Sequence, residues 1–342
     1  MPAILITGAS GFIGSHLAEQ GLAEGYEVWC AIRPSSSRQY LTDARLHLIV
    51  LDMSSDAALA QQIAEHVAAH GAWDFCIHAA GATKCLHPAD FRRTNTEGTA
   101  RLYRTLIAQS ALRRRFVFIS SLSVMGKVGG DDIHHVISAS DTPQPDTQYG
   151  ISKLAAEDAL REVRQSAGAA CPDYIILRPT GVYGPRERDY FMMADSLRRH
   201  IDFAVGYRQQ VITFIYVADL VRAAYLATER GTSGAAYFLT DGGEYDSRTF
   251  SDLLQEAMGV GRVLHIKAPL WLLRLVCTVS GAIGRLTGKA TTLNTDKYRI
   301  LAQRNWRCDI TPARHDLGYC PAWPLERGVS AAVAWYKAQG WL

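Results

Sequence analysis

The stretch from Ile4 to Gly14, ILITGASGFIG, constrains the fold of this 342-residue chain more than any other. A short apolar run typical of a buried strand leads into three glycines, and a helical pattern follows them. Gly8 allows a sharp turn off the strand, Gly11 lets the backbone approach a pyrophosphate, and Gly14 lets the helix pack closely on the sheet. The free N–H groups that begin the helix attract an anion. This stretch predicts a dinucleotide-binding unit, although the glycine spacing alone also fits a plain strand–helix turn.

The chain continues with short β-branched runs separated by helical stretches or loops. This alternation predicts a parallel sheet with helices on both faces, which is a doubly wound α/β fold. In such a sheet a ligand lies beyond the carboxyl ends of the strands. We expect strands at residues 4–7, 28–32, 46–52, 75–79, 116–120, 174–178, 211–217 and 236–240.

Length and composition limit the class of protein. Hydrophobic residues make up 48% of the chain, and a net charge of +3 gives no reason to expect a nucleic-acid partner. Seven cysteines without a C-x-x-C pair suggest buried free thiols, and a first strand at the very start leaves no room for a signal peptide, so we expect a cytoplasmic protein. We assign residues 1–182 and 211–244 to a dinucleotide-binding domain and residues 183–210 and 245–342 to a smaller, mixed substrate-binding lobe.

The segment from Pro269 to Leu286, PLWLLRLVCTVSGAIGRL, is the most hydrophobic piece outside the expected sheet. Arg274 interrupts it, and it is shorter than the ~20 residues that a membrane-spanning helix requires. It fits a core helix of the lobe, a lid on an apolar pocket, or an amphipathic helix on a membrane surface. We favour the core or lid interpretation over membrane contact.

A tyrosine and a lysine four residues apart, Tyr149 and Lys153, form the second informative motif. A helical run follows them, so both side chains lie on one helix face. A free phenol has a pKa near ~10, but a lysine ammonium and a nicotinamide cation nearby favour the phenolate. Tyr149 can then exchange a proton with a substrate hydroxyl while hydride moves to or from the nicotinamide. The spacing also occurs in ordinary helices, but the glycine stretch upstream favours the catalytic interpretation.

With these motifs the chain resembles the extended short-chain dehydrogenases/reductases, of the broad NAD-dependent epimerase/dehydratase and 3β-hydroxysteroid dehydrogenase type. The resemblance covers nearly the whole chain, and the C-terminal pattern at 316–319, 328 and 335–336 is similar to the 3β-hydroxysteroid dehydrogenase branch. The other matches follow the family's order: TGASGFIG at 7–14, LD at 51–52, HAAG at 78–81, NTEGT at 95–99, SS at 120–121, YGISK at 149–153 and RPTGVYGP at 178–185.

The resemblance implies roles for individual residues. Ser121 would bond the reacting oxygen beside Tyr149, with Ser120 and Ser123 as alternatives, and Asn95 would support the site. Lys153 would bond the nicotinamide ribose, while His78 would be structural. A homodimer through the helices that carry Asn95 and Tyr149 is also expected. The cofactor would contact Gly8, Ser10, Gly11, Phe12, Ile13 and Gly14 at the pyrophosphate, Asp52 and Met53 at the adenine, Ala79, Ala80 and Gly81 along one side, and Pro179 and Thr180 at the nicotinamide.

The end of the second expected strand bears on the choice of cofactor. An acidic residue there would bind a ribose diol, whereas a cation would accommodate a 2′-phosphate. The segment AIRPSSSR at 31–38 has no carboxylate, and Arg33 with Ser35 or Ser36 can bind a phosphate. NADP(H) is therefore favoured over NAD(H). Alternatively, Arg33 only stacks on the adenine.

No metal site is expected. Three functions fit these residues: an oxidoreductase, a nucleotide-sugar epimerase and a redox sensor. A dehydratase is disfavoured because residues 121–123 are Ser-Leu-Ser, where related dehydratases carry Thr-Asp-Glu. Nucleotide-sugar relatives commonly have Asn where this chain has Gly181, and an Arg-Asp-x-x-His-Val segment where residues 211–217 are VITFIYV. We therefore favour an oxidoreductase of an apolar, steroid-like secondary alcohol over a nucleotide-sugar 4-epimerase, and both over a redox sensor without turnover. The expected substrate contacts are Thr83, Ser123, Tyr183, Tyr190 and Phe191, although aromatic residues of this kind can equally be core.

Overall fold

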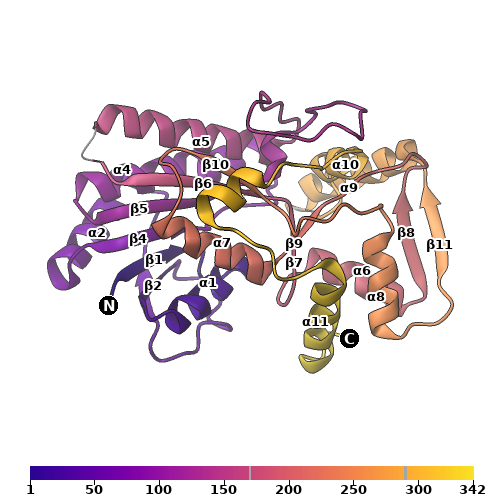
Figure 1. Cartoon of the computed structure of the whole chain (residues 1–342), viewed down its shortest axis with the longest axis horizontal. Coiled ribbons are helices and arrows are strands. Elements are labelled where there is room, and N and C mark those ends of the chain that lie inside the picture. Colours follow the sequence, from indigo (N-terminus) through magenta and orange to yellow (C-terminus); the bar gives the residue numbers. More distant parts are fainter. Residues whose placement is uncertain (169–170, 289–290) are drawn as a thin grey trace.

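The computed structural model describes residues 1–168, 171–288 and 291–342 (Figure 1). Its centre is a seven-stranded parallel sheet in the order β10-β6-β5-β4-β1-β2-β3. The inner strands are almost completely buried, as expected of a parallel sheet covered on both faces. The doubly wound α/β fold is confirmed. The strands are β1 (Ala3–Thr7), β2 (Glu27–Ile32), β3 (His47–Val50), β4 (Trp73–His78), β5 (Leu112–Ile119), β6 (Asp173–Pro179) and β10 (Ala236–Leu239).

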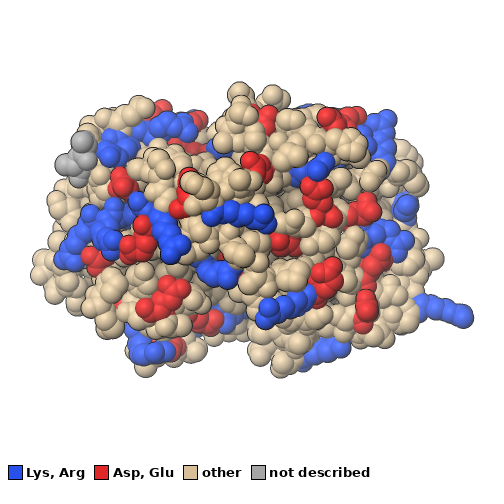
Figure 2. Space-filling view, viewed as in Figure 1, with Lys and Arg blue, Asp and Glu red and all other residues tan. Residues whose placement is uncertain are grey.

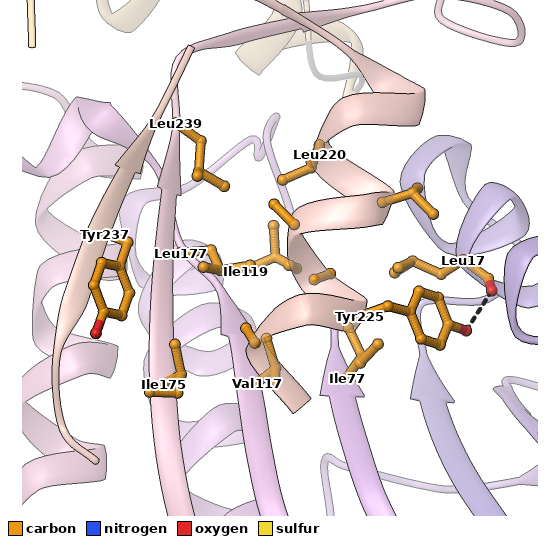
Figure 3. Packing of buried hydrophobic residues seen from close by; sticks show 14 of the residues in the cluster. Leu17, Ile77, Val117, Ile119, Ile175, Leu177, Leu220, Tyr225, Tyr237 and Leu239 are labelled. Atoms are coloured by element: carbon orange, nitrogen blue, oxygen red, sulfur yellow. Dashed lines mark hydrogen bonds between the residues drawn. The ribbon is translucent and has the colours of Figure 1, made fainter. Parts of the chain in front are cut away.

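Helices cover both faces of this sheet (Figure 1). Figure 3 shows one face, where Leu17 and Leu220 come from two different helices and pack over apolar side chains of the strands. On that face the Tyr225 hydroxyl donates a hydrogen bond of 2.7 Å to the Leu17 carbonyl and so ties the two helices together. The helices are α1 (Phe12–Ala23) and α7 (Val217–Glu229) on this face, and α2 (Asp56–His70), α4 (Gly98–Ala108) and α5 (Gln148–Ala167) on the other.

A smaller part lies beyond the carboxyl ends of the strands, on the right of Figure 1. It has its own core, rich in aromatic side chains. Two short parallel pairs belong to it, β7 (Gly181–Tyr183) with β9 (Phe214–Tyr216) and β8 (Ile201–Val205) with β11 (Leu264–Ala268). Its helices are α6 (Asp189–Arg198), α8 (Thr249–Met258), α9 (Leu270–Thr287), α10 (Thr295–Ala302) and α11 (Leu325–Ala338), and the remaining short helices of the chain are α3 (Pro88–Phe91), η1 (Arg92–Glu97), η2 (Leu122–Val124) and η3 (Ala313–Leu317).

Two expected strands differ from the observed ones. Of the strand predicted at 211–217, only β9 forms, and β9 pairs with β7 outside the main sheet. Thr213, just before β9, uses its hydroxyl to donate to the Trp306 carbonyl at 2.8 Å, which holds this segment in the C-terminal part. The strand predicted at 46–52 is the shorter edge strand β3. The proposed division at residue 182 stays a prediction, and β7 spans that position.

Helix α9 corrects an expectation about residues 269–286. Among the described residues it is the one helix long and apolar enough, by length and composition, to cross a membrane, but only 17% of it is buried. Its buried residues are Leu273, Cys277 and Gly284, whereas most of its large apolar side chains are exposed. The core-helix interpretation of this segment is therefore wrong.

The seven cysteines are free thiols, as expected. Cys30, Cys76, Cys171 and Cys277 are buried, and burial raises the pKa of Cys30 to about 12. The expected burial does not extend to all of them, since Cys85 and Cys308 are half-buried and Cys320 is exposed.

Candidate active site

The glycine turn after β1 has the shape that a pyrophosphate requires. Gly8 has a φ of +69°, and a Cβ there would lie 2.7 Å from the Ala80 nitrogen. Gly11 is the N-cap of α1 and donates its N–H to the Gly8 carbonyl at 2.9 Å, while a Cβ at Gly14 would collide with that same carbonyl. The first N–H groups of α1 therefore adjoin a turn whose glycines at positions 8, 11 and 14 place no side chain there, which fits the phosphates of a dinucleotide. Ser10 belongs to this turn, and Phe12 and Ile13 form the first residues of α1.

The residues expected at the adenine side follow β2 and β3. Arg33 is exposed at the end of β2, where its backbone N–H donates to the Ser36 hydroxyl at 3.0 Å, and Ser35 is exposed in the same turn. The Leu51 N–H donates to the Ile32 carbonyl at 3.3 Å, which brings Asp52 to the neighbouring strand end. Hydrogen bonds from Ser54 lower the pKa of Asp52. Met53 is half-buried, and its carbonyl accepts from Arg101 at 2.7 Å.

The end of β4 is fixed beside the glycine turn by His78. Its ring nitrogens bond the Thr7 hydroxyl at 2.6 Å and the Thr99 hydroxyl at 2.9 Å. Burial lowers the pKa of His78 to about 3, so this ring is neutral at pH 7 and serves as a structural link between β1, β4 and α4. The Ala79 and Ala80 N–H groups both donate to Thr7, each at 3.3 Å.

Asn95 lies in the π-helical turn η1 and is buried. Its side chain accepts from the Ala82 N–H at 2.7 Å and donates to the Ala82 carbonyl at 3.0 Å and the Ser152 hydroxyl at 2.9 Å. These bonds join the segment after β4 to helix α5. Asn95 thus takes part in holding the site together, but its hydrogen-bonding groups are engaged within the chain.

Tyr149 lies in the first turn of α5, a helix that Thr147 caps by accepting the Gly150 N–H at 2.9 Å. The Tyr149 hydroxyl lies near Ser121, whose own oxygen accepts the Ser123 N–H at 3.1 Å. Burial raises the pKa of Tyr149 to about 12, and the contact with Ser121 opposes this rise. The expectation that Lys153 and a nicotinamide cation together favour the phenolate stays a prediction, while burial in the protein itself raises the pKa of Tyr149.

Lys153 is buried one turn further along α5. Its Nζ donates to the Ile119 carbonyl at 2.8 Å, lies 4.6 Å from the centre of the Phe118 ring, and sits beside Gly81, where a Cβ would approach it to 3.3 Å. Burial lowers the pKa of Lys153 to about 8, and the charge of Glu157 opposes that change. The ammonium group thus lies beside Gly81, and the bond from Lys153 to a nicotinamide ribose stays a prediction.

Sequence reasoning missed a buried ion pair behind this site. Glu157 has no exposed surface and pairs with Arg178 of β6 at 2.6 Å and 3.1 Å. It also accepts the Ser120 hydroxyl at 2.5 Å. The pair fastens α5 to the two strands whose ends carry Ser121 and Pro179. The spacing in the sequence could have indicated Glu157, because Tyr149, Lys153 and Glu157 follow one another every four residues and so share one helix face.

A second missed residue, Asp296, comes from α10. Its carboxylate accepts the Tyr149 backbone N–H at 3.1 Å. The cap at Asn294, whose side chain accepts the Lys297 N–H at 2.9 Å, could have indicated a helix here. No local pattern could have placed that helix against Tyr149, 147 residues earlier.

The residues expected at the nicotinamide and substrate form two groups, the non-aromatic residues near the carboxyl edge of the sheet and the aromatic residues of the C-terminal part. Pro179 ends β6, and the Thr180 hydroxyl bonds Thr213 at 2.9 Å, so both lie at the carboxyl edge of the sheet. Ser123 is half-buried beside Ser121, and its carbonyl lies against Gly150, whereas Thr83 is exposed. Next to Thr83, Lys84 forms an ion pair of 2.6 Å with Asp189 of α6.

The aromatic residues expected to contact substrate lie in the C-terminal core. Tyr183 is fully buried, with its hydroxyl 3.4 Å from the Leu325 carbonyl, and Phe191 packs on Tyr336 and Trp341 at ring distances of 5.2 and 4.9 Å. These placements do not support substrate contact by Tyr183 or Phe191, which stays a prediction. The half-buried Tyr190 differs, because its hydroxyl lies against Gly181, at the carboxyl edge of the sheet.

No group of three or more His, Cys, Asp or Glu side chains suited to a metal ion occurs among residues 1–168, 171–288 and 291–342. The groups that converge on the carboxyl edge of the sheet are a glycine turn with a helix N-terminus, a buried lysine, and a tyrosine beside a serine. This set can hold a dinucleotide and move one proton at a substrate oxygen.

Comparisons with known proteins agree with this arrangement. The chain is 26% identical to a ceramide reductase from Caulobacter vibrioides, over 99% of this chain and 96% of the relative. It is also 26% identical to a 3-beta-hydroxysteroid dehydrogenase from Mycolicibacterium neoaurum, over 97% and 91%, and other relatives are UDP-glucose epimerases at 25% identity. The crystal structure of UDP-glucose 4-epimerase from Thermotoga maritima superposes with a TM-score of 0.76 at 22% identity, over 98% of this chain and 99% of the other, which shows a shared fold.

A known protein family also matches most of the chain. The family of NAD dependent epimerases and dehydratases matches residues 4–239, from β1 to the end of β10. That range contains the glycine turn, Ser121, Tyr149 and Lys153. The protein belongs to the NAD-dependent epimerase/dehydratase family and is an NAD(P)-dependent enzyme of the extended short-chain dehydrogenase/reductase type.

Proposed function

We propose that the protein is an oxidoreductase that interconverts a secondary alcohol and a ketone on an apolar, steroid- or lipid-like substrate. The observation that carries this proposal is the contact between Tyr190 and Gly181. The Tyr190 hydroxyl fills the space that any side chain at position 181 would enter, because a Cβ there would collide with it. Nucleotide-sugar relatives commonly carry an asparagine at this position, so the chain has the phenol of Tyr190 where they present an amide.

The second departure from the nucleotide-sugar pattern supports the same conclusion. The Thr213 hydroxyl donates to the Trp306 carbonyl at 2.8 Å, and Tyr216 is buried with its ring 4.5 Å from the ring of Trp323. These side chains are engaged within the protein and do not offer charged groups to a diphosphate. The ceramide and 3β-hydroxysteroid relatives, whose names indicate apolar substrates, agree with this proposal.

Tyr149 transfers the proton in the proposed reaction. With a pKa of about 12 it is a neutral phenol at pH 7, so it can donate its proton to the oxygen of a ketone that is being reduced. Ser121 holds the same oxygen by a second hydrogen bond, and the buried Lys153 stabilises the phenolate that remains. A bound nicotinamide cofactor supplies the hydride. In the reverse direction Tyr149 must first lose its proton, which the positive charge of Lys153 favours.

We further propose a preference for NADP(H) over NAD(H). Arg33 is exposed at the end of β2, and its fork of N–H groups suits a 2′-phosphate. Ser35 stands in the same turn. Asp52 is the nearby carboxylate, but Ser54 binds it through both its N–H and its hydroxyl, at 2.9 and 2.5 Å.

The experiment is a panel of substrates followed at 340 nm with each cofactor. The panel contains hydroxysteroids, long-chain secondary alcohols and their ketones, together with UDP-glucose tested for epimerisation at C4. We expect turnover of the apolar compounds and a higher kcat/KM with NADP(H). An Arg33→Asp variant should reverse the cofactor preference, and unchanged NADP(H) affinity in that variant would refute the cofactor argument.

The 4-epimerase is the second candidate, because it needs the same Ser121, Tyr149 and Lys153 and because UDP-glucose epimerases are among the relatives. Interconversion of UDP-glucose and UDP-galactose, without turnover of any apolar compound, would establish it and overturn the first proposal. A sensor without turnover would bind the cofactor and act on neither class. The homodimer implied by the family remains a proposal, which light scattering can test.

A further inference from the structure

Helix α9 exposes its more apolar face to solvent, whereas a surface helix normally packs that face on the protein. The side chains at Trp271, Leu275, Val279 and Ile283 are spaced every four residues and form one face of the helix. They are 68%, 53%, 49% and 53% exposed. On the opposite face Leu273 and Cys277 are buried, and there α9 packs against α10 (Figure 1). The more apolar side of α9 therefore faces outward.

Exposed apolar side chains also occur on the two-stranded sheet that precedes α9. Phe203 of β8 and Ile266 of β11 are register partners, so their side chains share one face of this sheet, and Leu264 lies on the same face. Phe203 is 60% exposed and Leu264 is 64% exposed. Only Pro269 separates β11 from α9, and Leu270 lies beside Gly206 at the end of β8. Single exposed apolar residues are ordinary, but a row of them along one helix face marks an interaction surface.

The charges of α9 indicate what this surface contacts. The helix contains two charged residues, Arg274 and Arg285, and no Asp or Glu. Eleven residues are close to three helical turns, so both arginines project from the same flank, between the apolar face and the packed face. On the face that Figure 2 shows, cations and carboxylates are interspersed, and the pair Arg114–Glu229 at 2.7 Å is an example of such pairing in the chain. A purely cationic flank beside an apolar face matches anionic lipid headgroups above acyl chains.

We infer that α9 docks on the surface of an anionic lipid bilayer, with its axis in the membrane plane. Trp271, Leu275, Val279 and Ile283 enter the acyl boundary, and the two arginines meet the phosphates. The helix does not cross the bilayer, because its buried face is fixed to the protein by Leu273 and Cys277. A second copy fits less well, since two-fold pairing of α9 would bring arginines together without a carboxylate on either helix.

This position would place a membrane next to the active site. Helix α10 packs along α9, and its Asp296 binds the backbone N–H of Tyr149. The docking itself requires neither substrate nor cofactor. Its test is therefore separate from the test of the proposed function, and either can fail without the other.

The experiment is flotation of the full-length protein with vesicles, without substrate or cofactor. One set of vesicles is pure phosphatidylcholine and the other contains about one third phosphatidylglycerol. We expect binding to the anionic vesicles that weakens in high salt. Leu275→Asp with Ile283→Asp should reduce binding about a hundredfold, because two buried apolar side chains are lost. Arg274→Gln with Arg285→Gln should reduce it roughly fivefold per arginine on anionic vesicles.

The matched control is Leu48→Asp with Val136→Asp, two exposed apolar positions away from α9, which should bind vesicles like the wild type. Circular dichroism establishes that each variant is folded. No vesicle binding by the wild type, or equal binding by the Leu275/Ile283 variant, would overturn the inference. So would light scattering in which the same variant turns a dimer into a monomer without lipid, because α9 would then contact a second copy.

Discussion

Helices α5 and α9 are similar in length and opposite in the way they meet the rest of the protein. Over 20 residues α5 buries a lysine and a glutamate, Lys153 and Glu157, which are 4% and 0% exposed. Over 18 residues α9 exposes a tryptophan and a row of aliphatic side chains. Each helix breaks the usual distribution of polar and apolar residues. The departures occur where a partner outside the chain is expected, a cofactor at α5 and a lipid surface at α9.

The difference lies in how each departure is stabilised. Around α5 the chain supplies the compensation, since Glu157 meets Arg178 and Ser120, and Lys153 meets the Ile119 carbonyl and the Phe118 ring. Around α9 the described part of the chain covers only the face that bears Leu273 and Cys277. Substitutions at the buried positions of α5 should therefore affect catalysis and folding, whereas substitutions on the outer face of α9 should affect neither.

The largest effect is expected for Tyr149→Phe. The change removes one proton and leaves the ring, so kcat should fall by about 10²- to 10⁴-fold, the usual contribution of a general acid or base. Cofactor affinity, measured by fluorescence titration, should stay unchanged. The exposed Tyr207→Phe is the matched control and should retain full activity. Unchanged turnover in Tyr149→Phe would refute the assigned role.

The next effect is expected for Glu157→Gln. Loss of the charge leaves Arg178 buried without its counter-ion, and breaking such a pair costs about 3 to 5 kcal/mol. Urea unfolding measures the cost. Glu162→Gln, at an exposed position of the same helix, should change the free energy of unfolding by less than about 0.5 kcal/mol. Equal stabilities of the two variants would show that the pair does not anchor α5.

A smaller effect is expected on the free energy of unfolding at acid pH, where protonation of His78 favours the unfolded state. Its pKa is about 3 in the folded protein and 6.5 in the unfolded chain, so below pH 6.5 the unfolded state binds more protons. Stability should then fall by about 1.4 kcal/mol for each pH unit, or about 2 kcal/mol at pH 5. His66, whose pKa burial lowers to about 4, adds to this slope. Unfolding at pH 7 and 5 should show a shallower loss in His78→Gln than in the exposed control His134→Gln, and identical slopes would contradict the assignment.

The smallest effect is expected on the outer face of α9. Leu275→Ala should change the free energy of unfolding by less than about 0.5 kcal/mol, because the side chain is already exposed. Leu273→Ala, on the buried face of the same helix, should cost about 2 kcal/mol or more. Thermal unfolding of the two variants makes the comparison. A large loss in Leu275→Ala would mean that another part of the chain covers this face in solution.

The same two helices show how far the sequence could predict the molecule. The alternation of β-branched runs with helical stretches and the Tyr149–Lys153 spacing are local patterns, so the parallel sheet and the presence of α5 followed from them. The partners of Glu157 and Asp296 lie far away in the chain, and no local pattern specifies them. The orientation of α9 could not be predicted for a related reason. Its composition requires only that an apolar face be covered, and the tertiary structure decides which face meets the protein.

The most direct test of the proposed chemistry is a label on the hydride. The enzyme is incubated with NADPH carrying deuterium at the transferred position of nicotinamide C4, together with an apolar ketone or with UDP-glucose, and the products are analysed by mass spectrometry. The proposed oxidoreductase should deliver deuterium to the apolar alcohol, with one cofactor oxidised for each alcohol formed. Interconversion of the UDP-sugars without net cofactor oxidation, and no label in any apolar product, would contradict it.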